Sequence, residues 1–449
     1  MASLSSALCY LYFLLIFFPI VGRCSRRKFE TYHTINIRTL LPRNVCSSSE
    51  ASRSLSPASI KVVHRHGPCS PLHLKQNPNH EQILDKDRSR VNAIHSRTAT
   101  IPAHTGDSLG TGNYIVTIGF GSPKREQSVI FDTGSDLTWI QCEPCLSCYQ
   151  QHEPIFDPSQ SSTYANISCS SSYCSELDIS GCTSSTCVYG VQYGDGSSTL
   201  GILSEDALTL TSSNVLPNFR FGCGKRNNGL FGEAAGLLGL GRKKVSVVSQ
   251  AFQKFGSIFA YCLPSTSSST GYLTFGGSST SSNVKFTPML TNPSMPTFYY
   301  LDLVAIHVGG RRLSISPTVF SKVGTIMDSG TVITRLPPVA YSSLRSAFRR
   351  LMSCYRSAQA LSILDTCYDL TGYSKVRIPK VALQFGGGIA TNLDTSGILY
   401  LANASQACLA FAGNSDAGDS GIIGNMQQKK FHVVYDVANK AIGFGPNGC

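Results

Sequence analysis

The sequence predicts an all-β protein of two related lobes, and two repeated motifs are the main reason. Residues 131–135 read Phe-Asp-Thr-Gly-Ser, and residues 327–331 read Met-Asp-Ser-Gly-Thr. Each follows apolar residues, as at the end of a buried strand. A Gly-Leu-Leu-Gly run at 236–239 follows the first motif, and Gly-Ile-Ile-Gly at 421–424 follows the second. The repeated order indicates a duplicated lobe in which each copy contributes one carboxylate.

The individual elements support this fold class, because strands are predicted more often than helices. Residue alternation and turn signals predict strands over 114–120, 219–221, 272–275, 299–308 and 376–385. Apolar residues at helical spacing predict helices over 81–94, 245–255 and 338–352. We expect the glycine motifs to let neighbouring backbone pass close to each Asp loop. A phosphate-binding loop would need a Lys-Ser/Thr ending, which the first glycine motif lacks.

The 449 residues divide into four expected zones. Residues 1–24 resemble an export signal, with an apolar run from Ala7 to Val21. A signal anchor stays open as an alternative, because Met1 to Ser6 carries no basic residue. Residues 25–98 are polar and basic and are expected to form a propeptide. Residues 99–293 and 294–449 are expected to form the N-terminal and C-terminal β lobes.

The formal net charge of +12 invites a nucleic-acid interpretation, but its distribution argues against one. Residues 25–98 contain 13 Lys/Arg and 5 Asp/Glu, whereas residues 99–449 contain 24 and 21. The body is therefore close to neutral. The basic run 242–244 is too short for a nucleic-acid stripe with interleaved aromatic residues.

The 17 cysteines predict an oxidising compartment. Thirteen lie in the body, and seven of these crowd between 142 and 187. Because thirteen is odd, one thiol is left unpaired or pairs outside the body. The run Cys142-x-x-Cys145-x-x-Cys148 could bind zinc, but no matching second pair has the usual spacing, so we expect no metal. Asn166 and Asn403 begin sequons and are candidate glycosylation sites.

Two carboxylates brought into one site cannot both ionise easily and therefore share a proton. Such a pair can act as base and acid in one turnover. Asp132 and Asp328 are the candidates. The alternative is that each is a turn Asp satisfied by local amides, which the duplicated context disfavours.

With these motifs, the chain resembles a pepsin-type aspartic endopeptidase of the plant nepenthesin-like branch over residues 112–449. Asp132-Thr-Gly-Ser, Tyr193-Gly-Asp-Gly-Ser and Asp328-Ser-Gly-Thr occur in the family's order, and the cysteine-rich insert is similar to that of the branch. The segment 61–69 resembles the propeptide of relatives of a chloroplast nucleoid DNA-binding protease. The resemblance implies the bilobal pepsin-like fold.

The resemblance also implies roles for particular residues. A water between Asp132 and Asp328 would attack the peptide carbonyl. The reaction would need no cofactor, and the protease activity would be greatest at acid pH. The hydroxyls of Ser135 and Thr331 would hydrogen-bond the two carboxylates. Tyr193 would be the flap tyrosine, and Trp139 would donate its indole N–H to it. Protein or peptide substrates and pepstatin-like inhibitors are the expected partners of a monomer.

The same resemblance implies three disulfide pairings. Cys142 is expected to pair with Cys148, Cys367 with Cys408, and Cys262 with Cys449. Cys354 is then the candidate for the odd thiol.

The basic propeptide is itself an expected partner of the body. Its positive charge would be attracted to an acidic cleft, and its six histidines would gain charge in acid. We therefore expect acid-triggered release and self-cleavage near residues 97–110.

Two other functions remain as alternatives to a secreted protease. One is a catalytically inactive protein-binding relative, and the other is a plastid nucleoid DNA-binding protease. The apolar leader resembles a secretory signal more than a transit peptide. It leaves the apoplast and the vacuole open as destinations.

Overall fold

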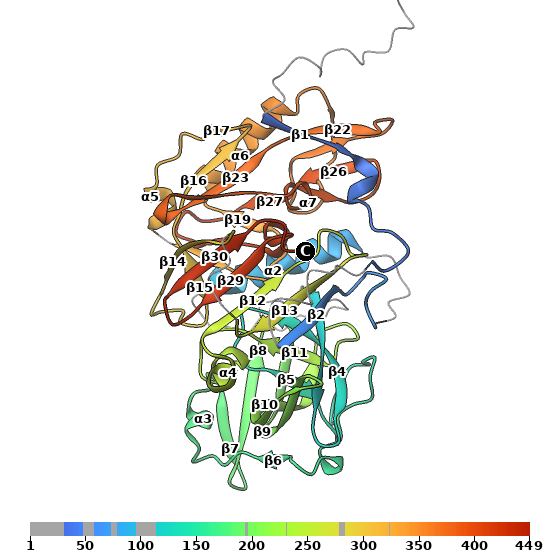
Figure 1. The fold of residues 1–449 in the computed structure, drawn as a ribbon, viewed down its shortest axis with the longest axis vertical. Helices are drawn as coiled ribbons and strands as arrows, with labels where there is room; N and C mark the ends of the chain where they lie inside the picture. The colour runs from blue at the N-terminus through green and yellow to red at the C-terminus, as the bar shows by residue number, and fades with distance from the viewer. Residues whose placement is uncertain are drawn as a thin grey trace, which may run out of the picture.

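The computed structural model describes residues 31–47, 58–72, 79–95, 114–193, 196–229, 231–277, 283–322 and 324–449. Two β-rich lobes are stacked along the long axis, and the predicted all-β bilobal architecture is confirmed (Figure 1). Helix α2 (His80–His95) lies between the lobes. The predicted export signal and the predicted cleavage region 97–110 lie outside the described residues.

The N-terminal lobe is built on a strand that ends at the first Asp motif. β4 forms an antiparallel pair with β3. On its other side it runs parallel to β11, which carries the first glycine motif. The long hairpin of β9 and β10 extends the same sheet. The strands of this lobe are β3 (Tyr114–Phe120), β4 (Arg125–Asp132), β5 (Trp139–Gln141), β6 (Ala165–Asn166), β7 (Ser180–Thr183), β8 (Thr186–Gln192), β9 (Ser198–Thr211), β10 (Asn214–Asn228) and β11 (Gly236–Gly239). Its helices are η4 (Pro158–Gln160), α3 (Ser172–Ser175) and α4 (Val247–Phe255).

The C-terminal lobe repeats this arrangement. β18 leads to the second Asp motif and runs parallel to β28, which carries the second glycine motif. The strands are β15 (Tyr299–Leu301), β16 (Leu303–Val308), β17 (Arg311–Arg312), β18 (Thr325–Met327), β19 (Thr334–Leu336), β20 (Arg356–Ala358), β21 (Cys367–Asp369), β22 (Lys375–Pro379), β23 (Val381–Phe385), β24 (Ile389–Asn392), β25 (Leu399–Leu401), β26 (Gln406–Leu409), β27 (Phe411–Gly413) and β28 (Gly421–Ile423). The helices are α5 (Thr318–Ser321), α6 (Pro338–Leu351), η5 (Gly386–Gly388), α7 (Thr395–Ile398) and α8 (Asn425–Gln428).

An antiparallel sheet joins the lobes and includes a strand from the N-terminal zone. Its order is β2 (Ala58–His64), β13 (Thr270–Phe275), β12 (Ile258–Cys262), β29 (His432–Asp436), β30 (Ala441–Gly445) and β14 (Lys285–Leu290). β2 also pairs with β3 through its last residues, so it lies between two body strands. β1 (Tyr32–Asn36) pairs with β22 at the far end of the other lobe, and η2 (Ile37–Leu40) follows it. The N-terminal zone therefore contacts both lobes.

Most predicted elements form, with shifted ends. The strand predicted at 299–308 is two strands, and that at 376–385 divides at Lys380 into β22 and β23, which have different partners. Helix α4 begins at Val247 because Ser246 caps it and accepts a hydrogen bond from the Ser249 N–H. Helix α6 begins at Pro338, where the first turn tolerates proline.

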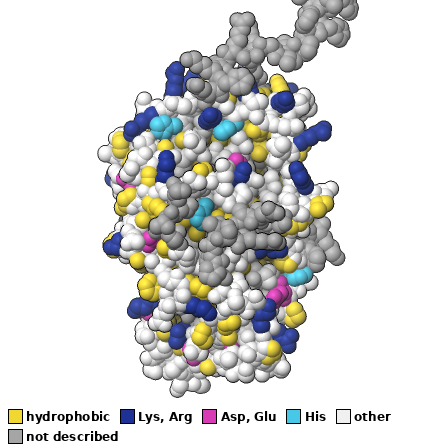
Figure 2. Space-filling view, viewed as in Figure 1, with side chains coloured by type: hydrophobic (Ala, Val, Ile, Leu, Met, Phe, Trp, Pro, Cys, Tyr) yellow, Lys and Arg dark blue, Asp and Glu magenta, His cyan; other side chains and the backbone are white. Residues whose placement is uncertain are grey.

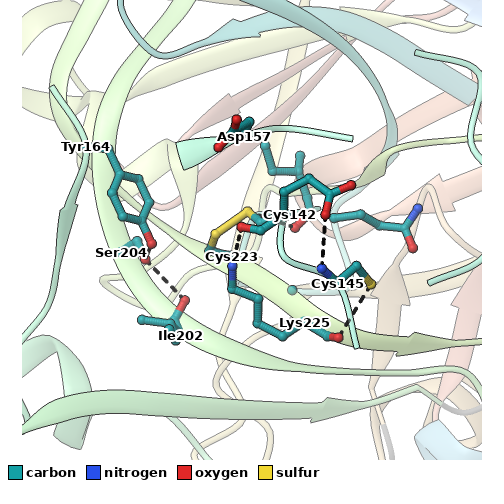
Figure 3. Close-up of a disulfide and its surroundings, with 12 residues drawn as sticks. Cys142, Cys145, Asp157, Tyr164, Ile202, Ser204, Cys223 and Lys225 are labelled. Carbon is teal, nitrogen blue, oxygen red and sulfur yellow. Dashed lines mark hydrogen bonds between the residues drawn. A yellow bond between two sulfur atoms is a disulfide. The ribbon is translucent and has the colours of Figure 1, made fainter. Parts of the chain in front are cut away.

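The disulfides correct one sequence-based assignment. Cys142 pairs with Cys223, not with Cys148, because β5 and β10 are neighbouring strands that bring these two cysteines together (Figure 3). Cys148 instead closes a tight loop with Cys145. The twelve other cysteines of the body pair with one another, so Cys354 is the odd cysteine of the body, as expected, and it is disulfide-bonded rather than a free thiol.

Five further bridges form among the described residues, and one of them fixes the C-terminal residue. The structure joins Cys262 with Cys449 and Cys367 with Cys408. It also joins Cys46 with Cys69, Cys169 with Cys182, and Cys174 with Cys187. Because Cys142, Cys145 and Cys148 are all oxidised, their run is not a zinc site.

The surface and the helices add two observations. Lys and Arg side chains are scattered over the face in Figure 2 and are not gathered into a stripe. Within the described residues, no helix combines the length and apolar character needed to cross a membrane.

Candidate active site

The two Asp motifs occupy equivalent positions at the junction of the lobes. Asp132 ends β4 and Asp328 directly follows β18, and their exposed fractions are 1% and 0%. The glycine-motif strands lie beside them, with Gly239 opposite Asp132 in the parallel ladder. A Cβ on Gly239 would collide with the backbone of Asp136, and one on Gly424 would collide with that of Val332. Close backbone approach therefore explains these glycines.

The residue after each Asp links one lobe to the other. The Thr133 N–H donates to Ser329 Oγ at 3.0 Å, and the Ser329 N–H donates to Thr133 Oγ1 at 2.9 Å. All four groups are buried. This reciprocal exchange fixes the two Asp turns relative to each other.

Arg90 of helix α2 lies between the two carboxylates, a position that no sequence motif predicted. Its Nη2 donates to Asp132 Oδ1 at 2.8 Å and to Asp328 Oδ1 at 3.0 Å. Its Nε donates to Asp328 Oδ2 at 3.0 Å. Gly134 and Gly330 make room, because a Cβ on either would collide with the guanidinium. The structure thus shows the two carboxylates in one site, closed by a residue of the N-terminal zone.

The pKa values of the two carboxyls are driven in opposite directions. Burial raises the pKa of Asp132, and the neighbouring Asp328 charge adds to that rise against the opposing charge of Arg90. Burial would raise the pKa of Asp328 too, but the charge and hydrogen bonds of Arg90 outweigh it. The Thr331 hydroxyl and the Gly330 N–H add to this, so its pKa falls below the ordinary value. Two carboxyls with opposed proton affinities are suited to acid and base roles.

The two expected hydroxyl partners differ. Thr331 Oγ1 donates to Asp328 Oδ2 at 2.6 Å, as expected. Ser135 lies close enough to lower the pKa of Asp132, but within the described part of the chain its hydroxyl meets no hydrogen-bond partner. In that part of the chain, the carboxylate of the second motif is therefore hydrogen-bonded by its motif hydroxyl, and that of the first motif is not.

Trp139 and Tyr193 are brought together beside the site. The Trp139 Nε1–H donates to Tyr193 Oη at 2.7 Å. Phe231 packs edge-on against both rings, at centroid distances of 4.8 and 5.6 Å. Burial raises the pKa of Tyr193 well above its ordinary value, so its hydroxyl stays neutral. Residues 194 and 195, which follow Tyr193 in the sequence, lie outside the described residues.

Asp87, one helical turn before Arg90, forms a second buried contact with the C-terminal lobe. Its Oδ1 accepts from the Val332 N–H at 2.5 Å, and its Oδ2 accepts from the Ile333 N–H at 3.1 Å. Arg335 Nη2 lies 2.9 Å from Asp87 Oδ2. The sequence carried a signal for this contact, because Asp87 falls on the apolar face of the predicted helix with Ile83, Leu84 and Val91.

The remaining candidate positions lie at the surface. Asn166 and Asn403 are both exposed, and their glycosylation stays a prediction. In the ranges that the structure describes, no three His, Cys, Asp or Glu side chains are grouped as metal ligands.

The comparisons with known proteins agree with this geometry. The family model described as xylanase inhibitor N-terminal matches residues 114–277, and that described as xylanase inhibitor C-terminal matches residues 298–446. An aspartyl protease family protein of Arabidopsis thaliana is 50% identical over 440 residues, which cover 93% of each chain. Aspartic proteinase nepenthesin-2 of Nepenthes gracilis is 37% identical over 80% of this chain and 82% of its own.

The solved structures support the fold. The crystal structure described as edgp is similar with a TM-score of 0.65 at 18% identity, covering 88% of this chain and 96% of that one. Conglutin gamma from lupine seeds gives a TM-score of 0.61 at 21% identity, covering 74% and 91%. By its fold, its paired Asp turns and its relatives, the chain belongs to the plant pepsin-type aspartic protease family.

Proposed function

We propose that this chain is the inactive precursor of an aspartic endopeptidase. The observation that carries the proposal is the shared contact of Arg90 with Asp132 and Asp328. A basic residue held between two buried carboxylates fills the space where a peptide bond and an attacking water would have to lie. The same contact supports both the catalytic assignment and the inactive state.

In the mature enzyme, Asp132 and Asp328 activate a water molecule together. The ionised carboxylate of the pair takes a proton from the water as it attacks the peptide carbonyl. The protonated partner donates a hydrogen bond to the carbonyl oxygen and stabilises the tetrahedral intermediate. Because the two carboxyls share one proton, the pH optimum reflects the titration of the pair and not of either residue alone. Tyr193, oriented by Trp139, closes over the substrate.

Residues 25–98 act as the propeptide, and three contacts hold it in place. Arg90 covers the carboxylates, Asp87 binds Arg335, and β2 occupies a place in the interlobe sheet. Charge attraction keeps the first two contacts closed at neutral pH. Acid favours release of the propeptide, because it protonates Asp328, whose pKa is lowered in the docked state, and charges half-buried histidines such as His66.

The disulfide-rich body supports passage through an oxidising compartment. We propose secretion to the apoplast, with the vacuole as the other destination, and glycosylation at Asn166 and Asn403. The inactive-relative alternative is disfavoured by the intact carboxylate pair. The plastid DNA-binding alternative has less support from the near-neutral body.

Cleavage of a protein substrate tests the proposal. The purified full chain is first held in acid and then assayed on casein from pH 3 to 7, with and without pepstatin. We expect acid-dependent cleavage that pepstatin blocks and that both Asp132→Asn and Asp328→Asn abolish. Full activity in either Asn variant would overturn the assignment, and no cleavage by the acid-treated native chain would favour the inactive relative.

A further inference from the structure

The body carries a built site for a carboxylate, and the N-terminal segment occupies it. The two backbone N–H groups of Val332 and Ile333 and the guanidinium of Arg335 all face the Asp87 carboxylate. Asp87 is fully buried and Arg335 is 4% exposed. Arg335 is held in place because its Nη1 donates to the Ile333 carbonyl at 2.8 Å. Three donors therefore converge on one acidic side chain.

This site adjoins the catalytic carboxylates. Val332 directly follows Thr331, whose hydroxyl donates to Asp328. Asp87 precedes Arg90 by three residues on α2, a rise of about 4.5 Å along the helix axis. An extended peptide advances about 3.3 Å per residue. A substrate side chain that reached this site would therefore belong to a residue within about three positions of the bond that is cut.

The three donors belong to the body, whereas the acceptor belongs to the segment that leaves on maturation. When α2 leaves, these donors lose the acceptor that covers them and are open to another one. Arg335 presents a positively charged guanidinium, for which a carboxylate is the matching partner. A peptide carbonyl can satisfy an N–H group, but a carboxylate also neutralises the guanidinium.

We propose that Arg335, with the Val332 and Ile333 N–H groups, forms a specificity subsite for an Asp or Glu side chain of the peptide substrate. The inference rests on the proposed protease function. Asp87 is then the internal counterpart of that substrate side chain, and Arg90 is the block at the catalytic pair.

A body carboxylate could compete for Arg335. Asp419 lies 3.3 Å from His95 of α2, and His95 also contacts the Ser420 carbonyl at 2.9 Å. Burial lowers the pKa of His95 and the charge of Arg335 adds to that, so both groups share this neighbourhood. When α2 leaves, Arg335 either stays unpaired until a substrate carboxylate binds it or forms an ion pair with Asp419. The test must separate these two outcomes.

The test compares substrate pairs in which one residue is Asp or its isostere Asn. Six pairs place that residue at each of three positions on either side of the cleaved bond. The acid-matured full chain is assayed near pH 5.5, and the readout is the ratio of kcat/KM values for the two members of a pair. We expect a ratio of about tenfold or more in favour of Asp at one position.

Variants assign that preference to Arg335. Within each enzyme the ratio cancels a general loss of activity, so Arg335→Gln should bring it close to one. Arg335→Lys, which keeps the charge but not the planar geometry, should give an intermediate ratio. A ratio near one at all six positions in the native enzyme overturns the proposal, as does a preference that survives Arg335→Gln. A preference that appears only in Asp419→Asn also overturns it, because Arg335 then pairs with Asp419.

The result also separates this proposal from the proposed function. If the native enzyme cleaves Asp and Asn peptides equally, the acidic subsite is wrong and the protease assignment stands. If it cleaves neither member of any pair nor casein, the protease assignment itself fails.

Discussion

Arg90 donates two hydrogen bonds to Asp328, from Nε to Oδ2 and from Nη2 to Oδ1, both at 3.0 Å. Planar guanidinium and carboxylate groups match in this two-point contact, which is stronger than a single hydrogen bond. The depressed pKa of Asp328 means that the contact is complete above the ordinary Asp range and is lost as pH falls through the depressed value.

Replacing Arg90 should therefore release the inhibition. Removing one partner of a buried ion pair costs about 3–5 kcal/mol, so Arg90→Met should weaken the docked propeptide. We expect maturation at a higher pH and at least a tenfold faster rate near pH 5.5, measured by gel and by peptide cleavage. Arg88→Met is the matched control, because Arg88 lies on the same helix, is 53% exposed and pairs with Asp85 at the surface. Equal rates for the two variants would contradict a blocking role for Arg90.

The histidines of the N-terminal zone should set the pH at which the propeptide is released from the body. Burial, followed by the charges of Arg65 and His80, lowers the pKa of His66 to about 3. Burial is also the main cause of the lowered pKa of His64. Each base binds fewer protons in the docked state than when released, so docking is most favourable above pH 6.5 and weakens as pH falls from there toward 3.

Substituting these residues should move release to lower pH. His66→Gln in the Asp132→Asn chain removes one proton-binding group while preventing self-cleavage. Fluorescence of Trp139, the only tryptophan, should report the transition, and its midpoint should fall by several tenths of a pH unit. His152→Gln, in the exposed part of the body, is the control. A midpoint that does not move for His66→Gln would contradict the prediction.

The Trp139–Tyr193 hydrogen bond should matter to catalysis through the position of the tyrosine. A neutral hydrogen bond contributes about 0.5–1.5 kcal/mol, so Trp139→Phe should lower kcat/KM by roughly two- to tenfold. Tyr193→Phe should have a similar effect. The double variant should lose less than the product of the two effects, because both substitutions remove one bond. Effects that multiply would indicate that the two residues act separately.

The corrected disulfides lead to a stability prediction. Cys142 and Cys223 close a loop of 81 residues, whereas Cys145 and Cys148 are separated by 3. Chain entropy gives stabilisation of about 4.5 kcal/mol for the long loop and about 1.6 kcal/mol for the short one. Thermal melting of the two paired Cys→Ser variants should show the larger loss for Cys142/Cys223. A larger loss for Cys145/Cys148 would show that local strain or residual structure dominates.

The sequence predicted features that depend on local patterns. Residues 114–120 alternate and form β3 over the same range. Residues 81–94 have helical spacing and lie within α2. Both Asp motifs were visible because each is a contiguous run with a glycine partner.

The contacts that escaped prediction join residues far apart in the sequence. Arg90 and Asp328 are 238 residues apart, and Asp87 is 245 from Val332. Pairing of Cys142 with Cys223 depends on β5 lying beside β10, which no local spacing encodes. The apolar face of α2 does contain the charged Asp87, but its partner Arg335 lies in the C-terminal lobe, far away in the sequence.

Strand β2 is bonded along both edges, to β13 from Ala58 to Val63 and to β3 from Val62 to His64. If β2 departs with the propeptide, two body strands lose a ladder partner at the same moment. Unpaired strand edges are templates on which another extended chain can add. Maturation would therefore carry an aggregation hazard that grows with protein concentration, and it would be safest where the precursor is dilute.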